Sequence, residues 1–87
     1  MYLEIEFSLS AFKHGATEED IRNALITLLY DEAWTSDESK FLLIGFDLNQ
    51  ALIEVMYVIT DDATVLVFHA MKCRKEYLNI LGGNIIQ

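Results

Sequence analysis

The residues of this chain that could do chemistry are two histidines and a set of cations gathered in two segments. They are Lys13 and His14, in a turn before the first expected helix, and His69, Lys72, Arg74, Lys75 and Tyr77 near the end of the chain. A histidine can exchange a proton near neutral pH, and lysine and arginine can stabilise negative charge on a reacting group. The combination indicates acid–base chemistry on an anionic ligand, provided that the fold brings Lys13 and His14 to the same face as His69, Lys72 and Arg74.

The positive charge of the chain is concentrated in the second segment. Residues 65–87 carry three cations against one carboxylate, a local charge of +2, whereas residues 1–64 carry three cations against thirteen carboxylates, a charge of −10. The whole chain therefore has a net charge of −8. A basic cluster within so acidic a chain indicates a local anionic ligand and not a general affinity for polyanions.

Each candidate residue also has a structural alternative. His14 is typical of a turn or capping residue, and His69 could be a hydrogen-bonded histidine of the sheet. Tyr77 fits the buried stripe of a last helix, where it would serve packing. Cations at the start of a helix oppose its dipole, however, and such local conflicts are typical of functional positions.

Composition predicts one folded domain spanning residues 1–87. The chain is 53% hydrophobic and contains no proline, which is far from the composition of disordered chains. Cys73 has no partner for a disulfide, and no spaced Cys/His cluster indicates a metal site. Glycine-rich phosphate loops and dinucleotide fingerprints are absent, so we expect neither a cofactor nor a metal. The single cysteine predicts a cytoplasmic protein, and Glu4 and Glu6 interrupt the first apolar run, so we expect neither a signal peptide nor a membrane span there.

The first half of the chain predicts a strand and then a helix. Residues 2–7 alternate apolar and acidic side chains, as in a half-buried strand at or near a sheet edge. Thr17 and Asp20 form a capping box, and apolar residues then recur at helical spacing at Ile21, Ala24, Leu25, Leu28 and Leu29. Residues 31–39 are polar and acidic, and we expect a loop there with room for a short strand at residues 33–35.

Three strands and a short helix are predicted to follow. Residues 41–46, 51–60 and 64–71 are β-rich and are joined by short polar connections, which is typical of an antiparallel meander. Residues 52–60 are almost continuously apolar, so this strand should be central, and Glu54 within it must meet a cation or reach an edge.

The end of the chain changes from strand to helix spacing. Simple alternation along the last strand puts His69 on the face of Val65 and Val67, opposite Ala70. Helical spacing then joins Cys73, Tyr77, Ile80 and Leu81, and Gly82-Gly83 should end that helix. The predicted fold is α+β, with the order β-α-β-β-β-α, one antiparallel-rich sheet and helices packed on it.

Several of these segments together resemble the BrnT-type toxins. The resemblance covers residues 13 to 81 approximately. It is carried by Lys13-His14-Gly15 before an acidic-headed helix, by Ile44-Gly45 in a strand, by a long apolar strand ending near Asp61-Asp62, and by the run HAMKCRKEY from His69 to Tyr77. It implies a RelE-like ribonuclease fold, a type II toxin–antitoxin system, and a cognate antitoxin encoded nearby.

The resemblance also assigns expected places to individual residues. Lys13 and His14 correspond to a turn that lines the family's cleft, and Arg74 and Tyr77 match basic and aromatic positions of its last helix. His69 and Lys72 fall where the family usually has a more arginine-rich strand end. Family toxins also tend to be basic, whereas an acidic chain repels a polyanion and should associate with it more slowly.

Two functions from different classes remain as expectations. The first is a metal-independent endoribonuclease in which His14 or His69 transfers protons, Lys13, Lys72, Arg74 and Lys75 bind phosphate, and Tyr77 stacks or donates a proton. The second is a catalytically inactive interaction module of the same fold that binds a basic protein. In either case the expected partner is an antitoxin, a small DNA-binding protein of basic character. Oligomeric state is left open, and so is an unrelated structural or small-ligand role.

Overall fold

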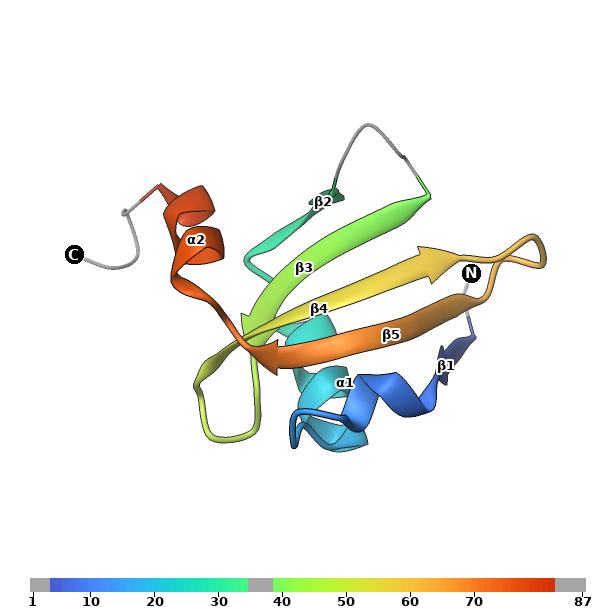
Figure 1. The fold of residues 1–87 in the computed structure, drawn as a ribbon, viewed down its shortest axis with the longest axis horizontal. Helices are drawn as coiled ribbons and strands as arrows, with labels where there is room; N and C mark the ends of the chain where they lie inside the picture. Colours follow the sequence, from blue (N-terminus) through green and yellow to red (C-terminus); the bar gives the residue numbers. More distant parts are fainter. Residues whose placement is uncertain (1–3, 35–38, 83–87) are drawn as a thin grey trace.

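The protein forms one five-stranded mixed sheet with a helix packed on one face. The computed structural model describes residues 4–34 and 39–82. The elements are β1 (Ile5–Phe7), η1 (Leu9–Phe12), α1 (Glu18–Ile26), β2 (Tyr30–Ala33), β3 (Lys40–Phe46), β4 (Leu52–Ile59), β5 (Val65–Lys72), α2 (Lys75–Leu78) and η2 (Asn79–Leu81). The strands lie in the order β1-β5-β4-β3-β2, with β1 parallel to β5 and all other neighbours antiparallel (Figure 1).

The expected α+β class and the antiparallel meander of three strands are confirmed. β3, β4 and β5 pair in sequence, β4 is the middle strand of the sheet, and β1 is an edge strand as the alternation predicted. The middle strand is buried from Ile53 to Tyr57. Burial on both faces explains why its sequence is almost continuously apolar.

The prediction of a loop over residues 31–39 is wrong for residues 31–33, which belong to the edge strand β2. Tyr30 pairs with Ile44 and Ala33 pairs with Phe41. An edge strand can carry acidic side chains because one side of it faces water. The acidic composition of this segment therefore could not distinguish an edge strand from a loop. Of the short strand expected at residues 33–35, only Ala33 belongs to β2, and residue 35 lies outside the described residues.

The first helix begins as predicted but ends earlier. Thr17 Oγ1 accepts the amide of Asp20, and the Asp20 carboxylate accepts the amide of Thr17 in return, which is the expected capping box. The helix stops at Ile26, so Leu28 and Leu29 lie beyond it and remain 45% and 39% exposed. Helical spacing alone did not show this end, because it depends on contacts between the helix and β3.

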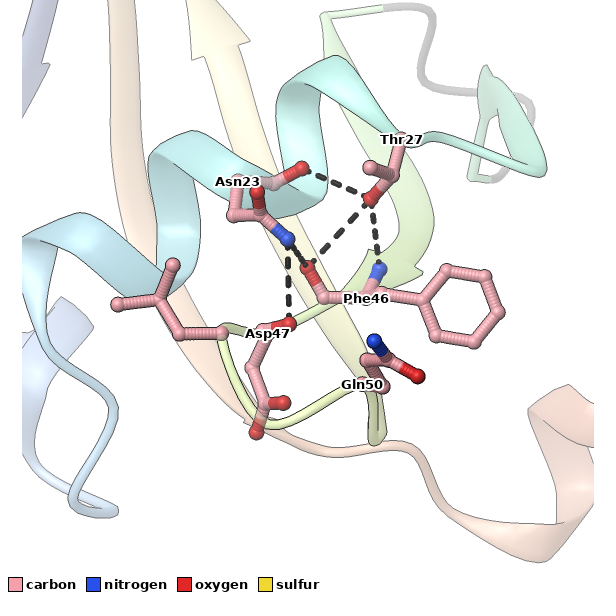
Figure 2. Close-up of a pocket in the computed structure, with 6 residues that line it drawn as sticks. Asn23, Thr27, Phe46, Asp47 and Gln50 are labelled. Carbon is pink, nitrogen blue, oxygen red and sulfur yellow. Dashed lines mark hydrogen bonds between the residues drawn. The ribbon is translucent and has the colours of Figure 1, made fainter.

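Two side chains tie the end of α1 to the end of β3. Asn23 Nδ2 donates to the carbonyls of Phe46 at 2.9 Å and Asp47 at 3.1 Å, and Thr27 Oγ1 accepts the amide of Phe46 at 3.0 Å (Figure 2). The helix also lies directly against the strand at Gly45, where a Cβ would stand 2.3 Å from the carbonyl oxygen of Ala24. Only glycine permits this close approach.

The main core lies between α1 and one face of the sheet. Its buried members come from η1, α1 and the three long strands: Ala11, Ile21, Ala24, Leu43, Ile53, Val55, Tyr57, Val65, Val67 and Ala70. The opposite face carries Leu42, Ile44, Glu54 and Met56, which are also buried. The sheet is thus covered on both faces near its centre.

The last helix is shorter than predicted and does not pack on the sheet as expected. Lys72 still belongs to β5, Arg74 occupies the N-cap position, and α2 comprises only Lys75–Leu78. No residue of α2 or η2 is buried, and Figure 1 shows α2 beyond the end of the sheet. The expectation that Tyr77 lies in a buried stripe is therefore wrong. Gly82 ends the helical region in a left-handed conformation, as predicted, and Gly83 lies outside the described residues.

Candidate functional site

A β-bulge in β5 decides where His69 points. Val67 pairs with Tyr57 and His69 pairs with Met56, so Phe68 is an extra residue without a partner opposite. The extra residue breaks the alternation, which is why Ala70 joins Val67 in the main core and His69 turns to the other face. The sequence-based placement of His69 on the face of Val67 is therefore wrong. Simple alternation cannot reveal a bulge.

Glu54 is the buried centre of a charged network on this second face. Its side chain is 0% exposed and accepts from four donors. His69 Nε2 lies 2.8 Å from Oε2, Arg74 Nη2 lies 2.7 Å from Oε2, and Arg74 Nε lies 3.1 Å from each oxygen. The Arg74 backbone amide also donates to Oε1 at 3.0 Å. The prediction that Glu54 must meet a cation is confirmed, because a buried carboxylate is too costly without such partners.

The network keeps Glu54 ionised. Burial alone raises the pKa of this carboxyl, but the hydrogen bonds from the Arg74 side chain and amide, and then from His69, outweigh burial and leave the pKa below its ordinary value of 4.5. An ionised carboxylate can only accept hydrogen bonds, so His69 Nε2 must carry the proton in this contact. In a neutral imidazole the second nitrogen, Nδ1, is then the one able to accept a proton.

His14 stands beside His69 although the two residues are 55 positions apart in the chain. The ring centroids lie 5.6 Å apart in an edge-to-face arrangement. Both rings line a hollow of about 410 Å³, here called the histidine hollow. Its lining residues are Ser10, Lys13, His14, Trp34, Met56, Phe68, His69 and Arg74. The fold thus brings together two imidazoles, a lysine and an arginine from the two segments that the sequence singled out.

η1 positions the Lys13–His14 turn beside the bulge. β1 pairs with β5 only as far as Val67, so the remaining edge of β5 is left for the η1 segment. Ser10 Oγ donates to the Phe68 carbonyl at 2.6 Å, which gives this backbone group of the bulge a hydrogen-bond partner. Ala11 is fully buried in the core, and Gly15 closes the turn with a φ of +94°.

The other predicted residues lie outside the histidine hollow. Lys72 pairs with Ile53 on the opposite face of the sheet and lines a second hollow, of about 380 Å³, to which His14 also contributes. The expectation that Lys72 shares one face with His69 and Arg74 is therefore wrong. Tyr77 lies under Arg74, whose guanidinium carbon is 5.0 Å from the ring centroid, a cation–π distance. Lys75 is an exposed residue of α2.

Cys73 lies near the network but is not a reactive group. Burial and then the charge of Glu54 raise the pKa of its thiol to about 11, so the thiol stays protonated at neutral pH. Within residues 4–34 and 39–82, no cluster of three or more His, Cys, Asp and Glu side chains is arranged to hold a metal ion. No helix among these residues is long and apolar enough to cross a membrane.

Sequence reasoning missed Glu54, Ser10 and Trp34 as members of the site. Glu54 did carry a signal, because a carboxylate inside an apolar central strand requires a nearby cation, and the basic segment at the end of β5 was the nearest source. Ser10 and Trp34 carried none, since their place depends on the bulge and on β2. No protein-family model matches this sequence, and no curated protein is significantly similar to it.

Proposed function

We propose that the protein is a metal-independent endoribonuclease of the toxin class, with the histidine hollow as its active site. The observation that carries the proposal is the approach of two imidazoles to 5.6 Å beside Lys13 and Arg74. Cleavage through the 2′-hydroxyl of RNA needs a base, an acid and a cation that stabilises the phosphorane. These three groups are the ones that this hollow gathers.

His69 is the better candidate for the general base. Glu54 holds its Nε2 proton through a 2.8 Å hydrogen bond, which fixes the ring orientation and leaves Nδ1 to accept the 2′-hydroxyl proton. His14, which forms no ion pair with a carboxylate among the described residues, is the candidate acid for the leaving 5′-oxygen.

Lys13 is the principal phosphate-binding cation in this mechanism. Glu54 already offsets the charge of Arg74, whereas Lys13 forms no ion pair with the described part of the chain. Arg74 contributes N–H groups that Glu54 does not use, and Tyr77 stacks beneath its guanidinium. Lys72 and Lys75 lie away from the scissile position and are candidates for contacts with flanking phosphates.

The toxin part of the proposal rests on the resemblance to BrnT-type toxins and on a small α+β fold that a RelE-like protein could have. It includes a cytoplasmic location and a cognate antitoxin. Induced expression of this chain, alone and with the neighbouring gene, tests it. We expect growth arrest and RNA cleavage that the neighbouring gene suppresses. Normal growth with intact RNA would contradict the toxin role.

A second candidate is a catalytically inactive module of the same fold that binds a basic protein. The observation that favours it is the acidity of the chain, since thirteen of its fourteen carboxylates precede the basic segment. Such a surface attracts a cationic partner and slows association with naked nucleic acid. Weak RNA binding without cleavage by the purified protein would favour this candidate over the nuclease.

A further inference from the structure

The second hollow adjoins the proposed active site and is called here the Lys72 hollow. It measures about 380 Å³ and is lined by His14, Gly15, Asp47, Asn49, Met71 and Lys72, among others. His14 lines both hollows, so a ligand whose reacting group lies in the histidine hollow beside the two imidazoles can extend directly into the Lys72 hollow. A volume in this range is typical of sites for small organic groups.

The walls of the Lys72 hollow are fixed before any ligand binds. Asp47 Oδ1 accepts the amides of Asn49 at 2.8 Å and Ala51 at 2.9 Å, which holds the turn between β3 and β4. The Asp20 carboxylate bonds the amides of Thr17 and Leu48 and so joins this turn to the start of α1. At Gly15 the space where a side chain would stand is open, with no atom within 4 Å of an added Cβ.

One strong acceptor remains unused on a residue that lines this hollow. Asp47 Oδ2 accepts no hydrogen bond from residues 4–34 or 39–82, and Figure 2 shows the carboxylate directed away from Asn23 and Thr27. The hollow is lined by two carboxylates, Asp20 and Asp47, and by one cation, Lys72, beside the imidazole of His14. The excess of negative charge disfavours a phosphate group inside the hollow. Apolar walls from Ile53 and Met71 suit the face of a planar ring, and an acceptor suits a group that carries N–H donors.

We propose that the Lys72 hollow binds the nucleoside next to the scissile phosphate and prefers a base with an exocyclic amino group. Adenine, cytosine and guanine have such a group, whereas the one N–H donor on the base edge of uracil, N3–H, is flanked by two carbonyl oxygens that a carboxylate repels. Lys72 would contact the next phosphate of the chain, on the side of this nucleoside away from the scissile phosphate. That phosphate would lie outside the part of the hollow lined by Asp20 and Asp47. The inference rests on the proposed ribonuclease function and adds a base preference to it.

The test compares cleavage of the sixteen ribodinucleotides by the wild-type protein and two variants. At one of the two positions we expect kcat/KM to be roughly ten-fold or more lower for uracil, the effect of one hydrogen bond to a charged group. Asp47→Asn keeps the Oδ1 acceptor that the turn needs but replaces Oδ2 by an N–H donor, so the preference should be lost or reversed. Asp62→Asn removes a carboxylate from a turn at the other end of β4 and should leave the preference unchanged.

A second measurement separates failure of this inference from failure of the nuclease proposal. The amide signals of Gly15 and Asn49 are followed by NMR during titration with the four nucleoside 3′-monophosphates. Equal cleavage of all dinucleotides, with Asp47→Asn behaving as Asp62→Asn, would overturn the base preference and leave the nuclease standing. If the wild-type protein cleaves none of the dinucleotides, the nuclease proposal fails. Shifts of the Gly15 and Asn49 signals that depend on the base would then still support a base-selective binding site in the Lys72 hollow. The absence of such shifts would overturn that site as well.

Discussion

At the scale of single residues, Glu54 links the stability of the protein to its proposed chemistry. Glu54→Gln keeps the size of the side chain but presents an amide N–H group to donors from His69 and Arg74. We expect the free energy of unfolding to fall by about 1–3 kcal/mol, because buried donors lose their acceptor. Urea denaturation at pH 7 measures this loss.

The matched control is Glu18→Gln, which breaks an ion pair on the surface of α1. Glu18 and Arg22 are 48% and 47% exposed, and such i,i+4 pairs contribute about 0.5 kcal/mol or less. Equal losses in the two variants would mean that the Glu54 network adds no more stability than a surface contact.

Acid should remove the contribution of Glu54 in a defined pH range. The pKa of this carboxyl is lowered on folding, so its stabilisation is complete above its ordinary value of 4.5 and is lost as the pH falls through the folded-state pKa. The difference in unfolding free energy between the wild-type protein and Glu54→Gln should shrink as the pH falls below 4.5. A difference that grows as the pH falls below 4.5 would contradict the lowered pKa.

Part of the site could be predicted from residue types, and part could not. The need of Glu54 for a cation followed from the cost of burying a charge, and the clustering of cations after β5 indicated where the site would be. The orientation of His69 did not follow, since it depends on the unpaired Phe68. Lys72 was misplaced for a different reason: the strand was expected to end at residue 71, but β5 continues through Lys72 and puts this residue on the face opposite His69.

At the scale of elements, the contact between α1 and β3 depends on Gly45. A Cβ at this position would meet the Ala24 carbonyl oxygen at 2.3 Å, so the helix must move or the strand must bend. We expect Gly45→Ala to lower the unfolding free energy by about 1–3 kcal/mol, as overpacked cores do. Urea denaturation checks this, and a variant as stable as the wild-type protein would show that α1 does not lie this close to β3.

Elements with strong periodicity were predictable, and those set by tertiary contacts were not. The capping box and the three long strands could be predicted from local sequence, because apolar periodicity and apolar runs reflect which faces of an element are buried. The edge strand β2 was missed because its acidic residues face water. The end of α1 was placed too late because Thr27 leaves the helix to bond Phe46, a contact with β3 that spacing along the helix does not reveal.

At the scale of the whole molecule, the charge of −8 bears on the choice of partner. We expect the cognate protein to be basic and its association rate to fall as salt is added, because screening shortens the Debye length from about 10 Å at 0.1 M to about 3 Å at 1 M. Stopped-flow mixing with the product of the neighbouring gene measures this rate. If the rate does not change with salt, the carboxylates serve solubility and do not steer a partner.

The central claim is that His14 and His69 act together on RNA, and cleavage by the purified protein in the presence of EDTA tests it most directly. His69→Gln retains an N–H donor for Glu54, so it can fold while losing proton transfer, and His14→Gln is its counterpart. Each substitution should lower kcat/KM by roughly 10²–10⁴, and the double variant should be little worse than either. Cleavage that persists at the wild-type rate in both single variants, or no cleavage by the wild-type protein, would contradict the claim.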